Sequence, residues 1–140
     1  MNFFDTSVLV SSLHRTDRRH YDSAKVLERA NKREAACSAH SVAELFSVLS
    51  GRPHPHRVPL EAALRLVEQV RERMQIVTLT EDDYFFTVSE SVRAGRMDGI
   101  IYDALLLACA RKVSADRIYT WNVSHFRAIA PDLAARIVEP

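Results

Sequence analysis

The sequence has few of the residues that break or cross-link a small protein. It contains 3 glycines, 5 prolines and 2 cysteines among 140 residues. So few glycines, beside many Ala, Leu, Val and Arg, argue against a turn-rich all-β fold and favour helices. Cys37 and Cys109 stand far apart in apolar stretches, without CxxC or Cys/His ligand spacing. A disulfide framework and a zinc site are therefore not indicated, and we expect two buried, reduced thiols.

Long hydrophobic runs and a strong net charge are also missing. The longest apolar run, residues 100–110, is too short to cross a bilayer and contains Asp103. The N-terminus lacks a basic segment followed by an apolar run, so no signal peptide is indicated. The formal net charge of +1 does not by itself point to a nucleic-acid partner. We therefore expect a soluble, cytoplasmic protein in which residues 1–140 form a single domain.

The hydrophobic pattern alternates short strands with amphipathic helices. Strands are expected at residues 3–4, 35–38, 75–79, 117–120 and 137–138, and helices at 17–32, 40–49, 60–74, 81–93, 100–112 and 125–129. A further short helix follows the first strand directly. This alternation predicts a three-layer α/β/α domain with a central, mostly parallel sheet.

The helix expected at residues 81–93 begins with a recognisable capping pattern. Thr80 and Asp83 have the spacing of a capping box. The apolar residues expected to form the buried stripe of this helix are Tyr84, Phe85, Val88 and Val92. The sequence thus predicts both the start of the helix and the face that it buries.

Asp5 stands at the end of the first strand, immediately before a helix. Open parallel sheets bind their ligands at the carboxyl ends of strands, so an acidic residue there is a candidate site residue. Asp5, Thr6 and Ser7 are also three consecutive residues that can cap a helix. The alternative is therefore that Asp5 only caps the helix that follows.

Two further carboxylates interrupt apolar helix faces. Asp103 has only apolar neighbours on its face of the helix at residues 100–112, and a buried unpaired charge is strongly unfavourable. Glu44 is the only formal charge between residues 35 and 51. The ordinary alternatives are a salt bridge from Asp103 to an arginine and a surface position for Glu44.

Together, Asp5, Glu44 and Asp103 would come from three different elements of the sheet and its flanking helices. Three converging carboxylates repel one another unless a cation lies between them. Oxygen ligands without Cys or paired His suit Mg²⁺ or Mn²⁺ better than Zn²⁺. Such a site supports in-line cleavage of phosphodiesters.

Four segments of the chain resemble the motifs of a known family. They are FFDTSVLV, SVAELFSVL, YDALLLACA and YTWNVSHF, and they occur in family order over essentially the whole chain. The sequence thereby resembles the PIN-domain ribonucleases and, among them, the VapC toxins of toxin–antitoxin pairs. The resemblance implies a Mg²⁺- or Mn²⁺-dependent endoribonuclease that acts on RNA. It also implies a homodimer and a cognate VapB-like antitoxin.

The resemblance also assigns roles to individual residues. It makes Asp5, Glu44 and Asp103 metal ligands, and it places Asn122 with them in the catalytic set, where many relatives have a fourth acidic residue. Thr6 would orient the ligands and Thr120 would line the site. His125 departs from the family, in which an aspartate is frequent at this position, so one possible carboxylate is missing.

Two other functions remain open at this point. Histidines in polar segments, namely His54, His56 and His125, could serve as acid and base of a metal-independent ribonuclease. Alternatively, the chain could be an inactive PIN-like module that only binds RNA or protein. For RNA bound by its phosphates, the arginines expected to contribute are Arg15, Arg18, Arg19, Arg52 and Arg57.

Overall fold

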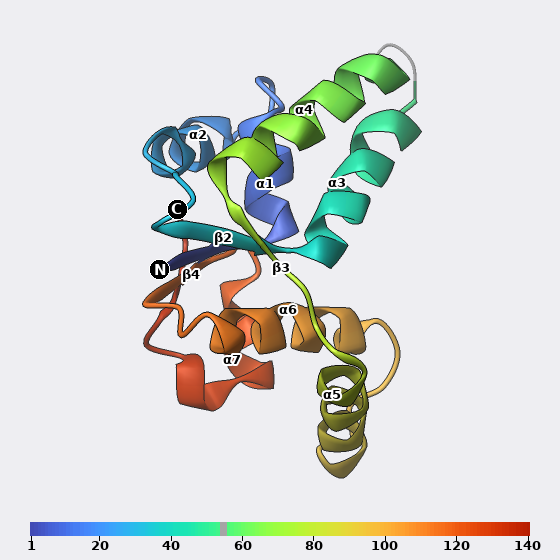
Figure 1. Cartoon of the computed structure of the whole chain (residues 1–140), viewed down its shortest axis with the longest axis vertical. Helices are drawn as coiled ribbons and strands as arrows, with labels where there is room; N and C mark the ends of the chain where they lie inside the picture. Colours follow the sequence, from blue (N-terminus) through green and yellow to red (C-terminus); the bar gives the residue numbers. More distant parts are fainter. Residues whose placement is uncertain (54–55) are drawn as a thin grey trace.

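The computed structural model, which describes residues 1–53 and 56–140, is built around a parallel sheet of five strands (Figure 1). The strands are β1 (Asn2–Phe4), β2 (Ala35–Ser38), β3 (Gln75–Val77), β4 (Arg117–Tyr119) and β5 (Ile137–Val138). Their spatial order is β3-β2-β1-β4-β5, and each neighbouring pair is parallel. The predicted parallel sheet is confirmed.

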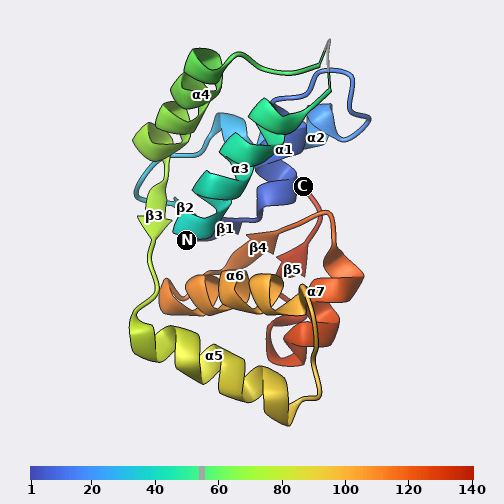
Figure 2. The ribbon, with the colours of Figure 1, turned by 90° about the vertical axis from the view of Figure 1, so that its right-hand side faces the viewer.

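Helices cover the sheet in two layers, as the two views in Figures 1 and 2 show. The first layer contains α1 (Thr6–Ser12), α2 (His20–Glu28), α3 (Ala39–Gly51) and α4 (Leu60–Arg73). The second contains α5 (Glu81–Arg93), α6 (Ile100–Lys112), α7 (Val123–Ile129) and the short 3-10 helix η1 (Pro131–Leu133). The three-layer α/β/α architecture is therefore confirmed, with a core on each face of the sheet.

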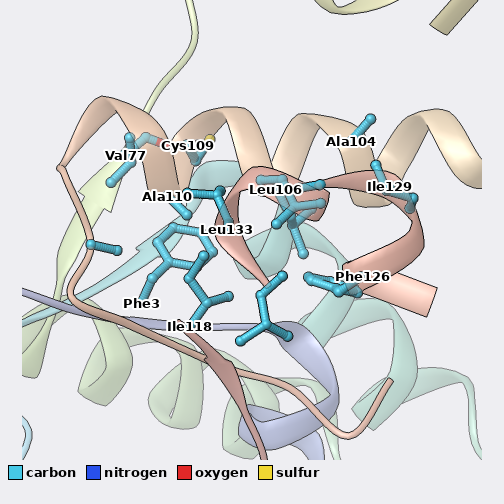
Figure 3. Packing of buried hydrophobic residues seen from close by; sticks show 14 of the residues in the cluster. Phe3, Val77, Ala104, Leu106, Cys109, Ala110, Ile118, Phe126, Ile129 and Leu133 are labelled. Carbon is cyan, nitrogen blue, oxygen red and sulfur yellow. Dashed lines mark hydrogen bonds between the residues drawn. The ribbon is translucent and has the colours of Figure 1, made fainter. Parts of the chain in front are cut away.

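The alternating side chains of β1 divide between these two cores. Phe3 points into the core beneath α6 and α7, and Phe4 points into the core beneath α1, α3 and α4. In Figure 3, Phe3 and Ile118 pack against Leu106 of α6, with Phe126 of α7 beside them. Because both faces are covered, β1 is fixed in depth and direction, and so is the residue that follows it.

Several helix boundaries differ from the predicted ones, among them the start of α2 and the end of α3. The helix predicted from Asp17 begins instead at His20, because the Asp17 carboxylate accepts a hydrogen bond from the Arg19 backbone N at 2.8 Å. This bond holds a turn in place of the first helical residues. Helix α3 continues through Gly51 rather than ending before it. No described helix is long and apolar enough to cross a membrane.

The packing face of α5 was predicted wrongly. The capping box of Thr80 and Asp83 is present, but the apolar stripe is exposed, with Phe85 at 69% and Val92 at 73%. The buried residues are Thr87 and Ser91, whose hydroxyls donate to backbone carbonyls one turn earlier. These small side chains allow α5 to pack against α6 without unpaired polar groups. The apolar face of α5 therefore points away from the core.

Both cysteines are free and buried, as predicted. Burial raises the pKa of the Cys37 thiol to about 12 and that of Cys109 to about 11. Thiolate chemistry at neutral pH is therefore disfavoured at both positions.

Candidate metal centre

The candidate site lies where the direction of strand order reverses. From β1 the chain builds the sheet first through β2 and β3, and later on the other side through β4 and β5. Phe4 is paired with Tyr119, so Asp5 and Thr120 leave adjacent strands at the same edge. Such a switch point at the carboxyl edge of an open parallel sheet is where these folds bind ligands.

Asp5 is buried, with 4% of its surface exposed, and neutral groups hold its carboxylate. Its Oδ2 accepts hydrogen bonds from Ser7 Oγ at 2.5 Å and from Thr120 Oγ1 at 2.8 Å. Asp5 occupies the N-cap position of α1, but its side chain makes no capping hydrogen bond. Burial raises the pKa of Asp5, these hydroxyl groups oppose the rise, and Glu44 adds to it by repulsion. Asp5 therefore combines an N-cap position with hydrogen bonds to two side-chain hydroxyls.

Asp103 lies in the first turn of α6 with its side chain 29% exposed. Its Oδ2 lies 3.0 Å from Nε2 of His125 on α7. The pKa of Asp103 is raised by burial and by the nearby Asp5 carboxylate, and the His125 contact partly offsets this. A partner was expected for Asp103, but it is a histidine rather than an arginine.

Glu44 is exposed on α3 and acts on both aspartates through space. Its negative charge contributes to the raised pKa of Asp5 and of Asp103. Across residues 1–53 and 56–140, however, no three His, Cys, Asp or Glu side chains come close enough together to form a metal-ligand group. The structure thus places the three predicted carboxylates within electrostatic range of one another without bringing them into contact.

Two threonines and Asn122 complete this edge of the sheet. Thr6 Oγ1 is buried and has no hydrogen-bond partner within the described part of the chain. Thr120 Oγ1 donates to Asp5 and accepts from the Asn122 backbone N at 3.0 Å. The Asn122 side chain is exposed and does not cap α7. Thr120 therefore links the carboxylate to the turn that carries Asn122.

Sequence reasoning missed the contacts of Ser7 and Trp121. The Trp121 backbone N donates to Ser7 Oγ at 3.1 Å, and Ser7 in turn donates to Asp5. The indole Nε1 of Trp121 donates to the hydroxyls of Ser11 and Ser23, at 3.1 and 2.9 Å. These bonds join α1, α2 and the end of β4 around Asp5. A serine two residues after a candidate aspartate is a signal that could have suggested the first contact.

The oxygen donors at this edge fit a hard divalent cation. Asp5 is a buried carboxylate, and no cationic side chain forms a salt bridge with it among the described residues. Thr6 supplies a buried hydroxyl without a partner beside it. A divalent cation would offset the desolvation that chiefly raises the pKa of both aspartates, and the repulsion that adds to it. An exposed glutamate such as Glu44 can change rotamer to join them.

The histidines proposed as an alternative acid–base set are not gathered in one place. His125 contacts Asp103, whereas the ring of His56 lies 6.0 Å from that of His14. His54 falls outside the described residues. A cavity of about 670 Å³ between α5, α6 and η1 is lined by none of the predicted site residues.

Comparison with known proteins identifies relatives over most of the chain. The sequence model of the PIN domain matches residues 3–130. Ribonuclease VapC27 of Mycobacterium tuberculosis is 32% identical over 113 residues, which are 80% of this chain and 78% of that protein.

Two solved structures share the fold at lower identity. VapC20 of Mycobacterium tuberculosis, described as a Sarcin-Ricin loop cleaving toxin, has a TM-score of 0.73 at 19% identity, over 91% of this chain and 95% of its own. VapBC-1 of nontypeable Haemophilus influenzae has a TM-score of 0.65 at 19% identity, over 99% of this chain and 96% of that chain.

Proposed function

Because the chain belongs to the PIN domain family, as the four sequence segments predict, we propose that it is a divalent-metal-dependent endoribonuclease of the VapC type. The relative that supports this activity is named a ribonuclease and is 32% identical to this chain over 113 residues. The observation that carries the proposal is the buried Asp5 carboxylate at the switch point of the sheet, which lies within electrostatic range of Asp103 and Glu44.

Asp5, Glu44 and Asp103 are the residues that would hold Mg²⁺ or Mn²⁺. When bound, such a cation lowers the pKa of a coordinated water and neutralises charge on the phosphoryl oxygens. Asn122 would add an uncharged amide oxygen, which can bind a hard cation or a water. This donor set holds one negative charge fewer than four carboxylates would.

The surrounding residues fix the orientation of these carboxylates. Ser7 and Thr120 hold Asp5 Oδ2 with two hydroxyl bonds, and His125 holds Asp103 Oδ2 from α7. Fixed donors need little reorganisation when substrate binds, which favours the transition state over a flexible arrangement. His125 thus occupies, as a positioning residue, the place where relatives often have an aspartate.

A basic region near the site offers a surface for the RNA backbone. The guanidinium of Arg19 lies 5.1 Å from the ring centre of Trp121, next to Asn122 in the chain. Further along α1 and α3, His14 lies near His56 and Arg52. Desolvation lowers the pKa of His14, and repulsion from the nearby Arg52 and His56 adds to this. Phosphates bind to such surfaces without sequence selection.

Purified protein and defined RNA test the activity. We expect cleavage in Mn²⁺ or Mg²⁺, with 5′-phosphate ends, and no cleavage in excess EDTA. Asp103→Asn should abolish cleavage, whereas Asp82→Asn, which removes an exposed carboxylate from α5, should not. Asp82 is a matched control because Asp83 beside it pairs with Lys112, at the opposite end of α6 from Asp103. Undiminished cleavage in EDTA, or cyclic phosphate ends, would refute the metal-dependent mechanism.

We further propose that the protein is a homodimeric toxin controlled by a VapB-like antitoxin. VapC20 is described as a toxin, and the Haemophilus structure is named VapBC-1, which supports this assembly. The exposed apolar face of α5 supplies a surface of the kind that partners cover. Its exposed residues are Phe85, Phe86, Val88 and Val92. Sedimentation of the protein alone and with its antitoxin should give a dimer and a larger complex, and a monomer at all concentrations would refute the dimer.

A further inference from the structure

An aromatic pair bridges the two helices that carry Glu44 and Asp103. The rings of His40 on α3 and Tyr102 on α6 are stacked, with centroids 5.3 Å apart and planes 6° from parallel. Tyr102 nevertheless has 55% of its surface exposed. One side of this ring therefore rests on His40, while a large part of it remains open to solvent.

The positions of these residues place the pair at the rim of the carboxylate site. Tyr102 directly precedes Asp103 in the first turn of α6. His40 precedes Glu44 by four residues, which puts both on the same face of α3. Since His40 contacts Tyr102, this face of α3 is turned toward the start of α6. The stacked rings therefore lie beside Asp103 on α6 and on the face of α3 that carries Glu44.

We propose that Tyr102, supported from beneath by His40, is a stacking platform for a nucleobase that flanks the cleaved phosphodiester. This proposal rests on the proposed ribonuclease function. Exposed aromatic rings bind unpaired bases by stacking, because every base has an apolar face. A parallel second ring keeps the tyrosine in one orientation, so less conformational freedom is lost on binding.

The other aromatic residue near the site is less suited to this role. Trp121 lies on the opposite side, beyond Thr120, and its indole N–H is engaged by Ser11 and Ser23. The guanidinium of Arg19 covers its ring at 5.1 Å. Tyr102 has no such cover, as its 55% exposure shows. A base stacked on Tyr102 beside α3 and phosphates bound on the Arg19 side would hold the RNA across the carboxylates.

The test compares RNA binding with and without the base in question. The RNA is an oligoribonucleotide that the wild-type protein cleaves, and its affinity is measured for the Asp5→Asn protein, which should bind it without cleaving it. Two further RNAs of the same sequence each carry one abasic nucleotide, one directly before and one directly after the cleaved bond. We expect Tyr102→Ala to weaken binding of the intact RNA by about 5- to 150-fold, the range of one base–aromatic stack. Tyr102→Phe should remain within about twofold, since phenylalanine keeps the ring.

The decisive measurement is the coupling between ring and base. One of the two abasic RNAs should bind equally to the protein with Tyr102 and to the protein with Tyr102→Ala, because that RNA lacks the base that would stack on the ring. Leu64→Ala, at an exposed apolar residue of α4, should leave every affinity unchanged. If Tyr102→Ala weakens intact and abasic RNAs alike, the ring only joins α3 to α6 and the platform is refuted. Wild-type protein that cleaves no RNA would instead refute the proposed function, and the platform with it.

Discussion

Replacing Asp103 with Asn should separate the stability of the metal-free protein from its response to metal. Burial and the Asp5 carboxylate raise the pKa of Asp103 in the folded protein. A raised carboxyl pKa means that stability from this group is present below its unfolded pKa and is lost as pH rises through the folded value. At neutral pH the ionised carboxylate therefore destabilises the fold. The contact between Asp103 and His125 is partly exposed, so it contributes little to the stability of the fold.

The expected response to metal follows from binding linkage. A cation at a concentration one hundred times its Kd stabilises the folded state by about 2.7 kcal/mol. For 140 residues, an unfolding entropy of roughly 290 cal/mol/K converts this into a Tm increase of about 9 °C. If Asp103→Asn weakens binding about a hundredfold, the gain falls to about 0.4 kcal/mol, or between 1 and 2 °C.

Thermal unfolding at pH 7.5, in EDTA and in a fixed Mn²⁺ concentration, measures both effects. In EDTA, Asp103→Asn should melt at the wild-type temperature or above it, and in Mn²⁺ it should melt below the wild type. Asp82→Asn should show the full wild-type increase. An equal increase in Asp103→Asn would show that the metal binds elsewhere and would refute this placement of the site. A large loss of stability in EDTA would refute the electrostatic argument.

Three further expectations address other parts of the chain. Asn122→Asp restores a negative charge with little change in volume, so it should lower the Mg²⁺ concentration that gives half-maximal cleavage. Asn122→Ala should raise that concentration. If the three proteins give the same value, Asn122 lies outside the site. The hydrogen bond from Lys112 lowers the pKa of Asp83 to about 2. The stability that the ionised Asp83 adds is therefore present above its unfolded pKa and is lost as pH falls toward 2. Urea midpoints of wild type and Asp83→Asn should differ at pH 7 and converge near pH 2. Neutralising Arg18 and Arg19 together should flatten the salt dependence of RNA binding, whereas an unchanged slope would mean that RNA does not contact them.

Local sequence patterns predicted much of the fold. The helix containing Asp103 was predicted with the bounds that the structure has, because an apolar run of that length has few alternatives in a chain of this kind. The strands and their parallel arrangement followed from the alternation of short apolar runs with helical periods. Asp5 could be placed at the edge of the sheet because strand ends carry a directional meaning in parallel sheets.

Features that depend on which elements meet could not be read from local patterns. The stripe of Phe85 and Val92 has the helical period of a core face, yet only tertiary packing decides which face of a helix is covered. The partner of Asp103 comes from α7, and that of Tyr102 comes from α3. Neither pairing leaves a trace in residue spacing, because each depends on how two distant helices cross over the sheet.

The hydroxyl bond between Thr120 and Asp5 joins residues 115 positions apart. Contacts of such long sequence separation form late in folding, because the loop that they close must be ordered first. During translation at about 5–20 residues per second, roughly 6 to 23 s separate the synthesis of the two residues. A ribosome-bound chain that has not yet released β4 holds the Asp5 carboxylate through Ser7 alone. The second hydroxyl bond, and with it the complete environment of this carboxylate, forms only after β4 has left the ribosome.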